Sequence, residues 1–295
     1  LQAGTDMDMV SCGFLNTLEE SLKEGKVTEE QINAACRRVL EAKYKLGLFS
    51  DPYKYCDTLR TREKLYTAEH RSSARTIATE TFVLLKNDHH LLPLDIKGKI
   101  ALIGPMADAR NNMCGMWSMT CTPSRHGTLL EGIRSAAGDK AEILYAKGSN
   151  IYYDAETEKA ATGIRPLERG DNRQLLDEAL RIAARADVIV AALGECAEMS
   201  GESVSRTNLE IPDAQQDLLK ALVKTGKPVV LLLFTGRPLV LNWEATNVHS
   251  ILNVWFGGSE TGDAVADVLF GKVAPSGKLT TTFPRSVGQL QLFYN

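Results

Sequence analysis

Short apolar runs alternate with segments of helical periodicity through most of the chain. The runs at 187–193 and 229–234 are apolar at nearly every position, which is typical of parallel strands buried on both faces. The predicted strands are 82–85, 100–103, 142–145, 187–193, 229–234 and 249–254, and the predicted helices are 67–81, 128–137, 172–185, 213–224 and 260–269. This α/β pattern predicts a mostly parallel sheet with helices on both faces. Ligands of such folds bind at the carboxyl ends of the strands.

The first fifty residues follow a different pattern. Residues 1–14 resemble a strand end that runs into a loop, and 15–24 have the pattern of a short helix. A longer helix is predicted to begin at a capping box formed by Thr28 and Gln31 and to end near Gly47. Two helices alone offer too little surface to bury the apolar stripe of the longer one.

Two polar stretches separate these patterned regions. The segment from Asp51 to about residue 66 has little periodicity, and we interpret it as an interdomain linker. Residues 150–171 are polar and charged, which indicates a surface insertion. Asp213 is expected to cap the helix that begins there.

Length and charge limit the classes of function. The 295 residues suit one large domain or two smaller ones, and 37 acidic against 34 basic residues give a net charge of -3. This balance argues against a partner such as nucleic acid or an anionic membrane, which would need a basic patch. No apolar run is long enough to span a membrane, and no signal peptide is visible. Because the chain opens at Leu1 in mid-pattern, we expect it to be a piece of a longer protein.

Several common chemistries lack their motifs in this sequence. Neither GxGxxG nor GxxxxGK[ST] occurs, which argues against a nucleotide cofactor, and no GxSxG elbow of a serine hydrolase is present. The five histidines are scattered, with His126 and His249 isolated, so we expect no metal site and no cofactor. The six cysteines form no CxxC pair and fit no zinc template, and we expect reduced, mostly packed thiols.

An acidic segment follows the predicted strand 187–193. Three carboxylates, Glu195, Glu198 and Glu202, lie within eight residues at the end of the sheet where a ligand would bind. A solvated acidic loop is the simplest explanation. Glu202, however, lies between Gly201 and a serine, which would allow a ligand to approach closely, whereas Glu195 directly follows the strand and suits a structural role.

The segment from Glu198 to Pro212, EMSGESVSRTNLEIP, resembles the acid/base loop of family 3 glycoside hydrolases, with the bacterial periplasmic β-glucosidases as the most similar subgroup. Asn208 departs from the pattern, since many relatives carry Asp there. Further segments resemble the family in the same order along the chain: 3–9, 35–49, 84–87, 91–94, 225–230, 255–262, 267–271, 275–279 and 283–288. The resemblance therefore extends over essentially the whole chain.

The resemblance implies a three-layer αβα sandwich preceded by the last strand and helices of a TIM-like barrel. The implied domains are a barrel remnant at 1–50, a linker at 51–75, the sandwich at 76–285, and the start of a further linker at 286–295. Members of the family are retaining exo-β-glycosidases, which use two carboxylates about 5–5.5 Å apart. The family nucleophile is an Asp within a Ser-Asp-Trp motif on the barrel, and that motif does not occur here.

By resemblance, Glu202 is the general acid/base and the nucleophile lies on a barrel outside this chain, so the chain alone is expected to be inactive. Ser200 and Arg206 are candidates for binding sugar or holding the loop, and a salt bridge within the loop is the simpler role for Arg206. Trp117 and Trp255 are candidates for a sugar-stacking face, although core positions are the simpler expectation.

The implied partners are a β-linked oligosaccharide or glucoside and the absent barrel domain, with a homo-oligomer left open. The implied location is periplasmic or secreted. The alternative to an enzyme is a non-catalytic carbohydrate-binding or scaffolding αβα module in which the acidic loop is merely solvated.

Overall fold

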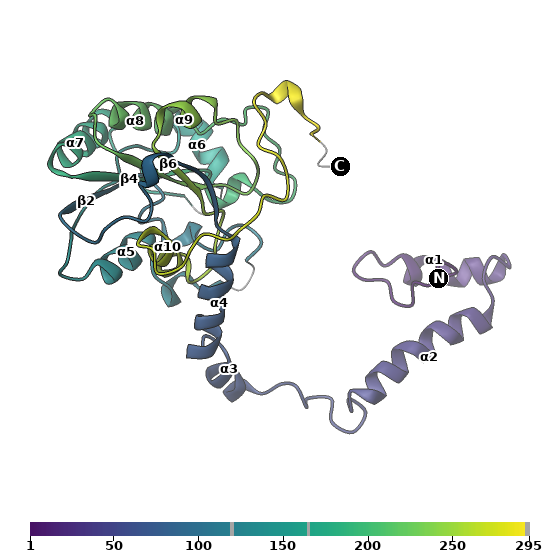
Figure 1. The fold of residues 1–295 in the computed structure, drawn as a ribbon. Helices are drawn as coiled ribbons and strands as arrows, with labels where there is room; N and C mark the ends of the chain where they lie inside the picture. The colour runs from purple at the N-terminus through teal and green to yellow at the C-terminus, as the bar shows by residue number, and fades with distance from the viewer. Residues whose placement is uncertain (119–120, 164–165, 293–295) are drawn as a thin grey trace. The chain divides into compact units, whose positions relative to one another are not determined.

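The computed structural model describes residues 1–118, 121–163 and 166–292 (Figure 1). The chain divides into two compact units, residues 1–65 and the remainder from Tyr66 onward. Each unit has its own secondary structure and is described by itself.

The first unit is helical. It consists of α1 (Gly13–Lys23), α2 (Glu29–Lys45) and α3 (Thr58–Lys64), and residues 1–12 contain no strand. The capping box that begins α2 is confirmed, because the Gln31 amide donates to Thr28 Oγ1 (3.3 Å) and the Thr28 amide donates to Gln31 Oε1 (3.1 Å). The sequence did not indicate α3, whose first turn is capped by the Asp57 carboxylate.

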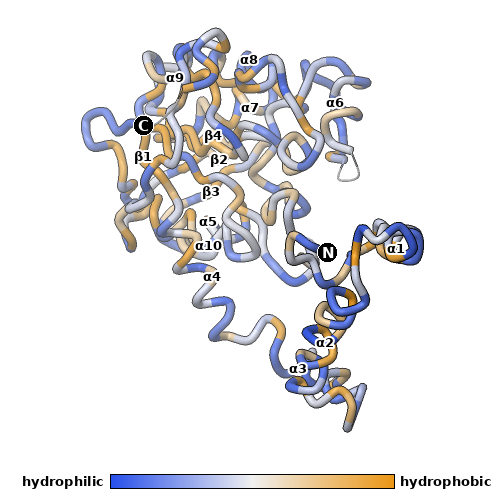
Figure 2. Tube along the Cα trace, turned by 90° about the vertical axis from the view of Figure 1, so that its right-hand side faces the viewer, coloured by the Kyte–Doolittle hydropathy of each residue, from blue (hydrophilic) through white to orange (hydrophobic). Residues whose placement is uncertain are grey.

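The helices of the first unit bury very little apolar surface. No residue of α1 is buried, and Ala35 is the buried residue of α2. Leu15 is 83% exposed and Leu40 is 44% exposed. Figure 2 shows that hydrophobic and hydrophilic positions are mixed along α2. As expected, the helices of the first unit offer too little surface to bury the apolar stripe of α2.

The second unit is built on a six-stranded sheet with the order β1-β6-β5-β4-β2-β3. Strand β1 is antiparallel to its neighbour β6, whereas every other pair is parallel. The strands are β1 (Val83–Asn87), β2 (Lys99–Ile103), β3 (Glu142–Ala146), β4 (Val188–Gly194), β5 (Val229–Phe234) and β6 (Ser250–Asn253). The prediction of a mostly parallel sheet is confirmed, with all six strands near their expected positions.

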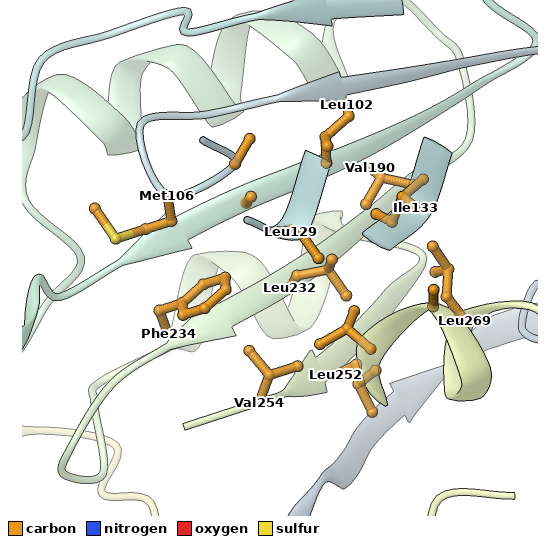
Figure 3. Close-up of a cluster of buried hydrophobic side chains, with 14 of the residues drawn as sticks. Leu102, Met106, Leu129, Ile133, Val190, Leu232, Phe234, Leu252, Val254 and Leu269 are labelled. Carbon is orange, nitrogen blue, oxygen red and sulfur yellow. The ribbon is translucent and has the colours of Figure 1, made fainter. Parts of the chain in front are cut away.

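Two helical layers cover the sheet. One face packs on α4 (Ala68–Thr81), α5 (Leu129–Ala137) and α10 (Thr261–Leu269), and the opposite face on α7 (Asn172–Arg185), α8 (Asp213–Val223) and α9 (Asn242–Asn247). Alternate residues of each strand point into opposite layers. Leu102 and Val190 lie in the core cluster of Figure 3, whereas their neighbours Ile103 and Ala191 lie in the cluster on the other face of the sheet. These layers form the αβα sandwich. The 3₁₀ turns are Asp88–His90, Arg110–Asn112, Pro123–Arg125, Ala197–Met199 and Val287–Gln289.

The polar stretch 150–171 is not simply a surface insertion. It contains α6 (Ala155–Thr162), and Glu158 on that helix is 2% exposed. Its carboxylate accepts a hydrogen bond from the Tyr152 amide and pairs with Arg169 (2.6 Å). A side chain that is buried through polar contacts within one segment produces no apolar periodicity, so the sequence pattern missed this packing.

The start of α8 also differs from expectation. Pro212 occupies the N-cap position, and Asp213 is the first helical residue. The Asp213 carboxylate instead accepts a hydrogen bond from the Tyr153 amide (3.2 Å) and thereby ties α8 to the segment before α6. The prediction of Asp213 as the cap was therefore wrong by one position.

Candidate functional site

The candidate site is the β4 loop, residues 195–212, which follows β4 in the middle of the sheet. It follows Gly194, the last residue of β4, which has φ +130 and where a Cβ would lie 2.0 Å from the Phe234 carbonyl oxygen. Only glycine allows the chain to leave the sheet at this point. The Gln215 side chain on α8 accepts from the Gly194 amide (2.8 Å) and donates to its carbonyl (2.9 Å), so the loop starts from a rigid position.

Glu195, the first residue of this loop, is fully buried and holds the base of the loop together. Its Oε1 accepts a hydrogen bond from Arg206 Nη1 (2.6 Å) and lies 3.2 Å from Arg237 Nε. Its Oε2 accepts from Thr235 Oγ1 (2.8 Å) and from the Gly236 amide (3.1 Å). Four groups thus compensate the burial of one carboxylate, which confirms the structural role suggested by its position.

Arg237 extends from the loop after β5 and holds the other half of the β4 loop. Its Nη2 donates to the carbonyl of Met199 and, at 3.5 Å, to the carbonyl of Val204. These two carbonyls flank Gly201, Glu202 and Ser203, so one guanidinium fixes both sides of that turn. The sequence analysis missed Arg237, although its position three residues after the end of the buried strand β5 was an available signal.

Glu202 lies at the exposed tip of the turn. Within the described part of the chain, its carboxylate has no hydrogen-bond or ion-pair partner. The next residue, Ser203, has φ 60, a left-handed conformation typical of tight turns. The carboxylate is therefore open to solvent on a turn whose two sides are anchored.

Ser200 and Arg206, the other predicted site residues, lie on either side of this tip. Arg206 is turned inward, because in addition to Glu195 its guanidinium donates to the Glu210 carbonyl (3.1 Å) and to Tyr152 Oη (3.4 Å). Ser200 packs on the neighbouring loop, where a Cβ on Gly236 would lie 1.9 Å from its Oγ. The salt bridge within the loop is present for Arg206, and the role of both residues toward a sugar stays a prediction.

The loop after β2 lies beside the tip of the β4 loop. A Cβ on Gly201 would lie 2.6 Å from Met116 Cγ, so these two loops are in contact. Trp117 follows Met116 and is 70% exposed, so the expectation of a core position was wrong for this residue. Trp255 is half-buried, donates to the Thr81 carbonyl (3.1 Å) and has its ring 6.3 Å from that of Phe283, so it lies at the edge of the fold and not in the core that we expected.

The cysteines differ from the expectation of reduced, packed thiols. Cys114 and Cys121 form a disulfide on the loop after β2, and Cys12, Cys36 and Cys56 are exposed. Cys196 is the buried free thiol among the described residues. His126, which the sequence shows as isolated, lies beside both bonded sulfurs. Disulfide pairing within seven residues had no motif that could have signalled it.

Comparison with known proteins identifies the family. Residues 82–295 match the family described as "Glycosyl hydrolase family 3 C-terminal domain". This chain belongs to glycoside hydrolase family 3. The recognised domain carries the whole sheet and the β4 loop, so the resemblance noted in that loop reflects membership of the family.

Individual relatives and solved structures agree. The chain is 44% identical over 301 residues to a "Periplasmic beta-glucosidase" of Salmonella typhimurium and 36% identical over 307 residues to a "Beta-xylosidase" of Formosa agariphila. It is similar in structure to a β-glucosidase from Listeria innocua in complex with isofagomine, with a TM-score of 0.83, 33% identity, and coverage of 100% of this chain and 38% of that one.

The family 3 relatives are much longer than this chain. All of this chain is matched, but it spans 39% of the Salmonella protein and 40% of the Formosa protein. Among the described residues, no helix is both long and apolar enough to cross a bilayer.

Proposed function

We propose that this chain supplies the general acid/base, Glu202, of a retaining exo-β-glycosidase that releases terminal β-linked glucose from oligosaccharides or glucosides. The observation that supports it best is that an exposed carboxylate lies on a turn whose two sides are held in place by hydrogen bonds. Arg237 and the buried Glu195 hold the loop, while the Glu202 carboxylate keeps no protein partner among the described residues.

In this mechanism Glu202 first protonates the glycosidic oxygen as the aglycone departs, and then removes a proton from the water that releases the sugar. A second carboxylate must act as the nucleophile about 5–5.5 Å away. We propose that it lies on an N-terminal barrel outside this chain, since the relatives are more than twice as long. The chain alone would then be inactive.

In the proposed protein, residues 1–50 are the end of that barrel, 51–75 are a linker, 76–285 are the sandwich, and 286–295 are the start of a following linker. The protein would be periplasmic or secreted, as the name of the Salmonella relative suggests. Trp117 would stack on the substrate, because it is exposed and directly follows Met116, which contacts the turn that carries Glu202. Ser200 would border the same sugar.

The test is Glu202→Ala in a protein that contains both this chain and the proposed barrel. Aryl β-glucosides with poor leaving groups should lose about 10²–10⁴-fold in kcat, because their departure needs protonation. For glucosides with a good leaving group, such as 2,4-dinitrophenolate, turnover should be limited by the second step, in which water releases the sugar. Azide should restore turnover and yield a β-glucosyl azide, since this anion attacks without a general base.

Glu210→Gln is the matched control, because Glu210 is an exposed carboxylate on the same loop and should keep normal turnover. Normal hydrolysis of poor leaving groups by Glu202→Ala would remove Glu202 from the mechanism. Comparison of glucosides with xylosides on the same enzyme would test the sugar, since relatives named for both activities match this chain.

The alternative is a non-catalytic carbohydrate-binding module, and the exposed indole of Trp117 is the observation that favours it. Calorimetry of this chain with cellobiose separates the two functions. Binding by the chain alone that is lost in Trp117→Ala would support the module. The enzyme proposal expects weak or no binding, because the rest of the sugar site would lie on the barrel.

A further inference from the structure

Two cysteines and a histidine meet on the loop after β2, and the proposed function uses none of them. Cys114 and Cys121 are joined by a disulfide with Cα atoms 6.5 Å apart. His126 Nε2 lies 3.6 Å from the Cys114 sulfur and 3.4 Å from the Cys121 sulfur. The three side-chain atoms that could bind a metal all lie within 4.8 Å of one another.

The imidazole of His126 is oriented as a metal-binding histidine usually is. The residue is 4% exposed, and its Nδ1 lies 3.3 Å from the Gly127 carbonyl oxygen. A carbonyl only accepts, so Nδ1 carries the proton in this hydrogen bond, and Nε2 is left with its lone pair toward the two sulfurs. Metal-bound histidines commonly donate their other ring N–H to a backbone carbonyl in this manner.

The distances suit a tetrahedral zinc-type ion. With Zn–S of about 2.3 Å and Zn–N of about 2.05 Å, a tetrahedron separates each sulfur from the nitrogen by about 3.6 Å. The two distances from His126 Nε2, 3.6 and 3.4 Å, lie close to this value. The sulfurs themselves would need to be about 3.8 Å apart, which requires the disulfide to open.

The charge of the arginine that binds the His126 main chain is compensated. Arg110 lies nearby, but it donates through one nitrogen to the His126 main-chain carbonyl and through another to the Glu131 carboxylate. Its charge is thus paired with an acidic group. Both cysteines are half-buried, which leaves room for a solvent molecule as the fourth ligand.

We propose that Cys114, Cys121 and His126 form a binding site for Zn²⁺ when the disulfide is reduced. A dithiol reductant would supply two electrons and two protons and become a disulfide itself, leaving two thiols on the protein. The ion would then displace both thiol protons to solvent and bind two thiolates and the neutral imidazole. Thiolate and imidazole ligands favour Zn²⁺ over Mg²⁺ or Ca²⁺.

The test uses this chain with Cys12, Cys36 and Cys56 replaced by serine, because these exposed thiols would bind zinc on their own. The protein is reduced under argon, freed of reductant, and titrated with Zn²⁺ alone by calorimetry. We expect one ion per reduced chain and none per oxidised chain. Co²⁺ in place of Zn²⁺ should give the charge-transfer absorption of thiolate ligands. Absence of binding by the reduced chain would overturn the proposal.

Two variants in this background separate the cluster from adventitious thiol binding. His126→Asn and Cys121→Ala should each weaken Zn²⁺ binding at least tenfold, while His70→Asn, which changes an exposed histidine on α4, should leave it unchanged. Tryptophan fluorescence verifies that each variant is folded. Equal affinity in folded Cys121→Ala and in the parent would overturn the proposal even if His126→Asn failed to fold. None of these measurements depends on hydrolytic activity.

Discussion

Glu195 and Glu202 are two carboxylates on one loop with opposite environments. Glu195 is fully buried and is met by Arg206, Arg237, Thr235 Oγ1 and the Gly236 amide, whereas Glu202 is exposed with no protein partner among the described residues. A carboxylate with its acceptor sites occupied inside the protein cannot exchange a proton with a substrate. The difference indicates that the base of the loop is held rigidly, while the carboxylate at its tip is open to solvent, as the proposed acid/base role requires.

Truncation of the two carboxylates should lower stability by very different amounts, and this is the largest expected contrast. Glu195→Ala should lower the free energy of unfolding by about 3–5 kcal/mol, because it leaves two arginines at the base of the loop without their carboxylate. Glu202→Ala should change it by less than about 0.5 kcal/mol. Urea unfolding followed by tryptophan fluorescence measures both, since Trp117, Trp243 and Trp255 all lie in the second unit.

A fall in stability for Glu202→Ala as large as that for Glu195→Ala would contradict the division between base and tip. Glu195→Gln is a useful intermediate, because the amide keeps the shape of the side chain but loses the charge that Arg206 and Arg237 share.

The sheet was predictable from sequence because burial on both faces produces uninterrupted apolar runs, as in β4 and β5. The position of the β4 loop followed from the same pattern, and Glu195 was rightly suspected of a structural role. The helices α6 and α9 were missed because they are short, and Glu158 on α6 is buried through polar contacts that leave no apolar period.

The partners of the site residues were not predictable. Arg237 reaches Glu195 across 42 positions of sequence, and Met116 meets Gly201 from a separate loop. Such contacts depend on which strands are neighbours, here β2, β4 and β5, and a single sequence contains no direct record of strand order. The disulfide between Cys114 and Cys121 likewise depends on the path of one loop.

Arg237 joins the base to the tip, so its replacement tests whether the two are coupled. Arg237→Lys should lower stability by about 1.5–3 kcal/mol, because a single ammonium cannot reach Glu195 and the carbonyls of Met199 and Val204 together. Arg173→Lys, at an exposed position of α7, is the matched control and should be neutral. Urea midpoints at constant m-value give the comparison, and equal midpoints for both variants would argue against the coupling.

Gly236→Ala tests how tightly the tip is packed against the loop after β5. The added Cβ would lie 1.9 Å from Ser200 Oγ and 2.5 Å from Ser200 Cβ, so Ser200 must move. We expect a loss of about 1–3 kcal/mol in stability, relieved in part by a second change, Ser200→Gly. At Gly288 the nearest atom, Ser286 Oγ, would be 3.7 Å from the new Cβ, so Gly288→Ala should be neutral. Thermal unfolding of the three variants reports the result.

Cys196, next to Glu195, tests whether the base of the β4 loop is closed to solvent and reagents, and its expected effect is the smallest. It is fully buried, and burial raises the pKa of its thiol to about 12. At pH 8, iodoacetamide should label Cys12, Cys36 and Cys56 while Cys196 stays unmodified, as peptide mass spectrometry would show. Labelling of Cys196 as fast as Cys36 would mean that the base opens readily.

The Cys196 thiol also makes the free energy of unfolding depend on pH. Because the folded state keeps the Cys196 proton up to about pH 12, while an unfolded thiol loses it from about pH 8.5, the unfolded state binds fewer protons in this interval. Stability must then fall as the pH rises through it and be unaffected below it. Cys196→Ala should remove this part of the alkaline loss, whereas the contribution of Tyr145, whose pKa burial also raises to about 12, persists in both proteins. Parallel curves of unfolding free energy against pH for the two proteins would show that the base of the loop already admits water in the folded state.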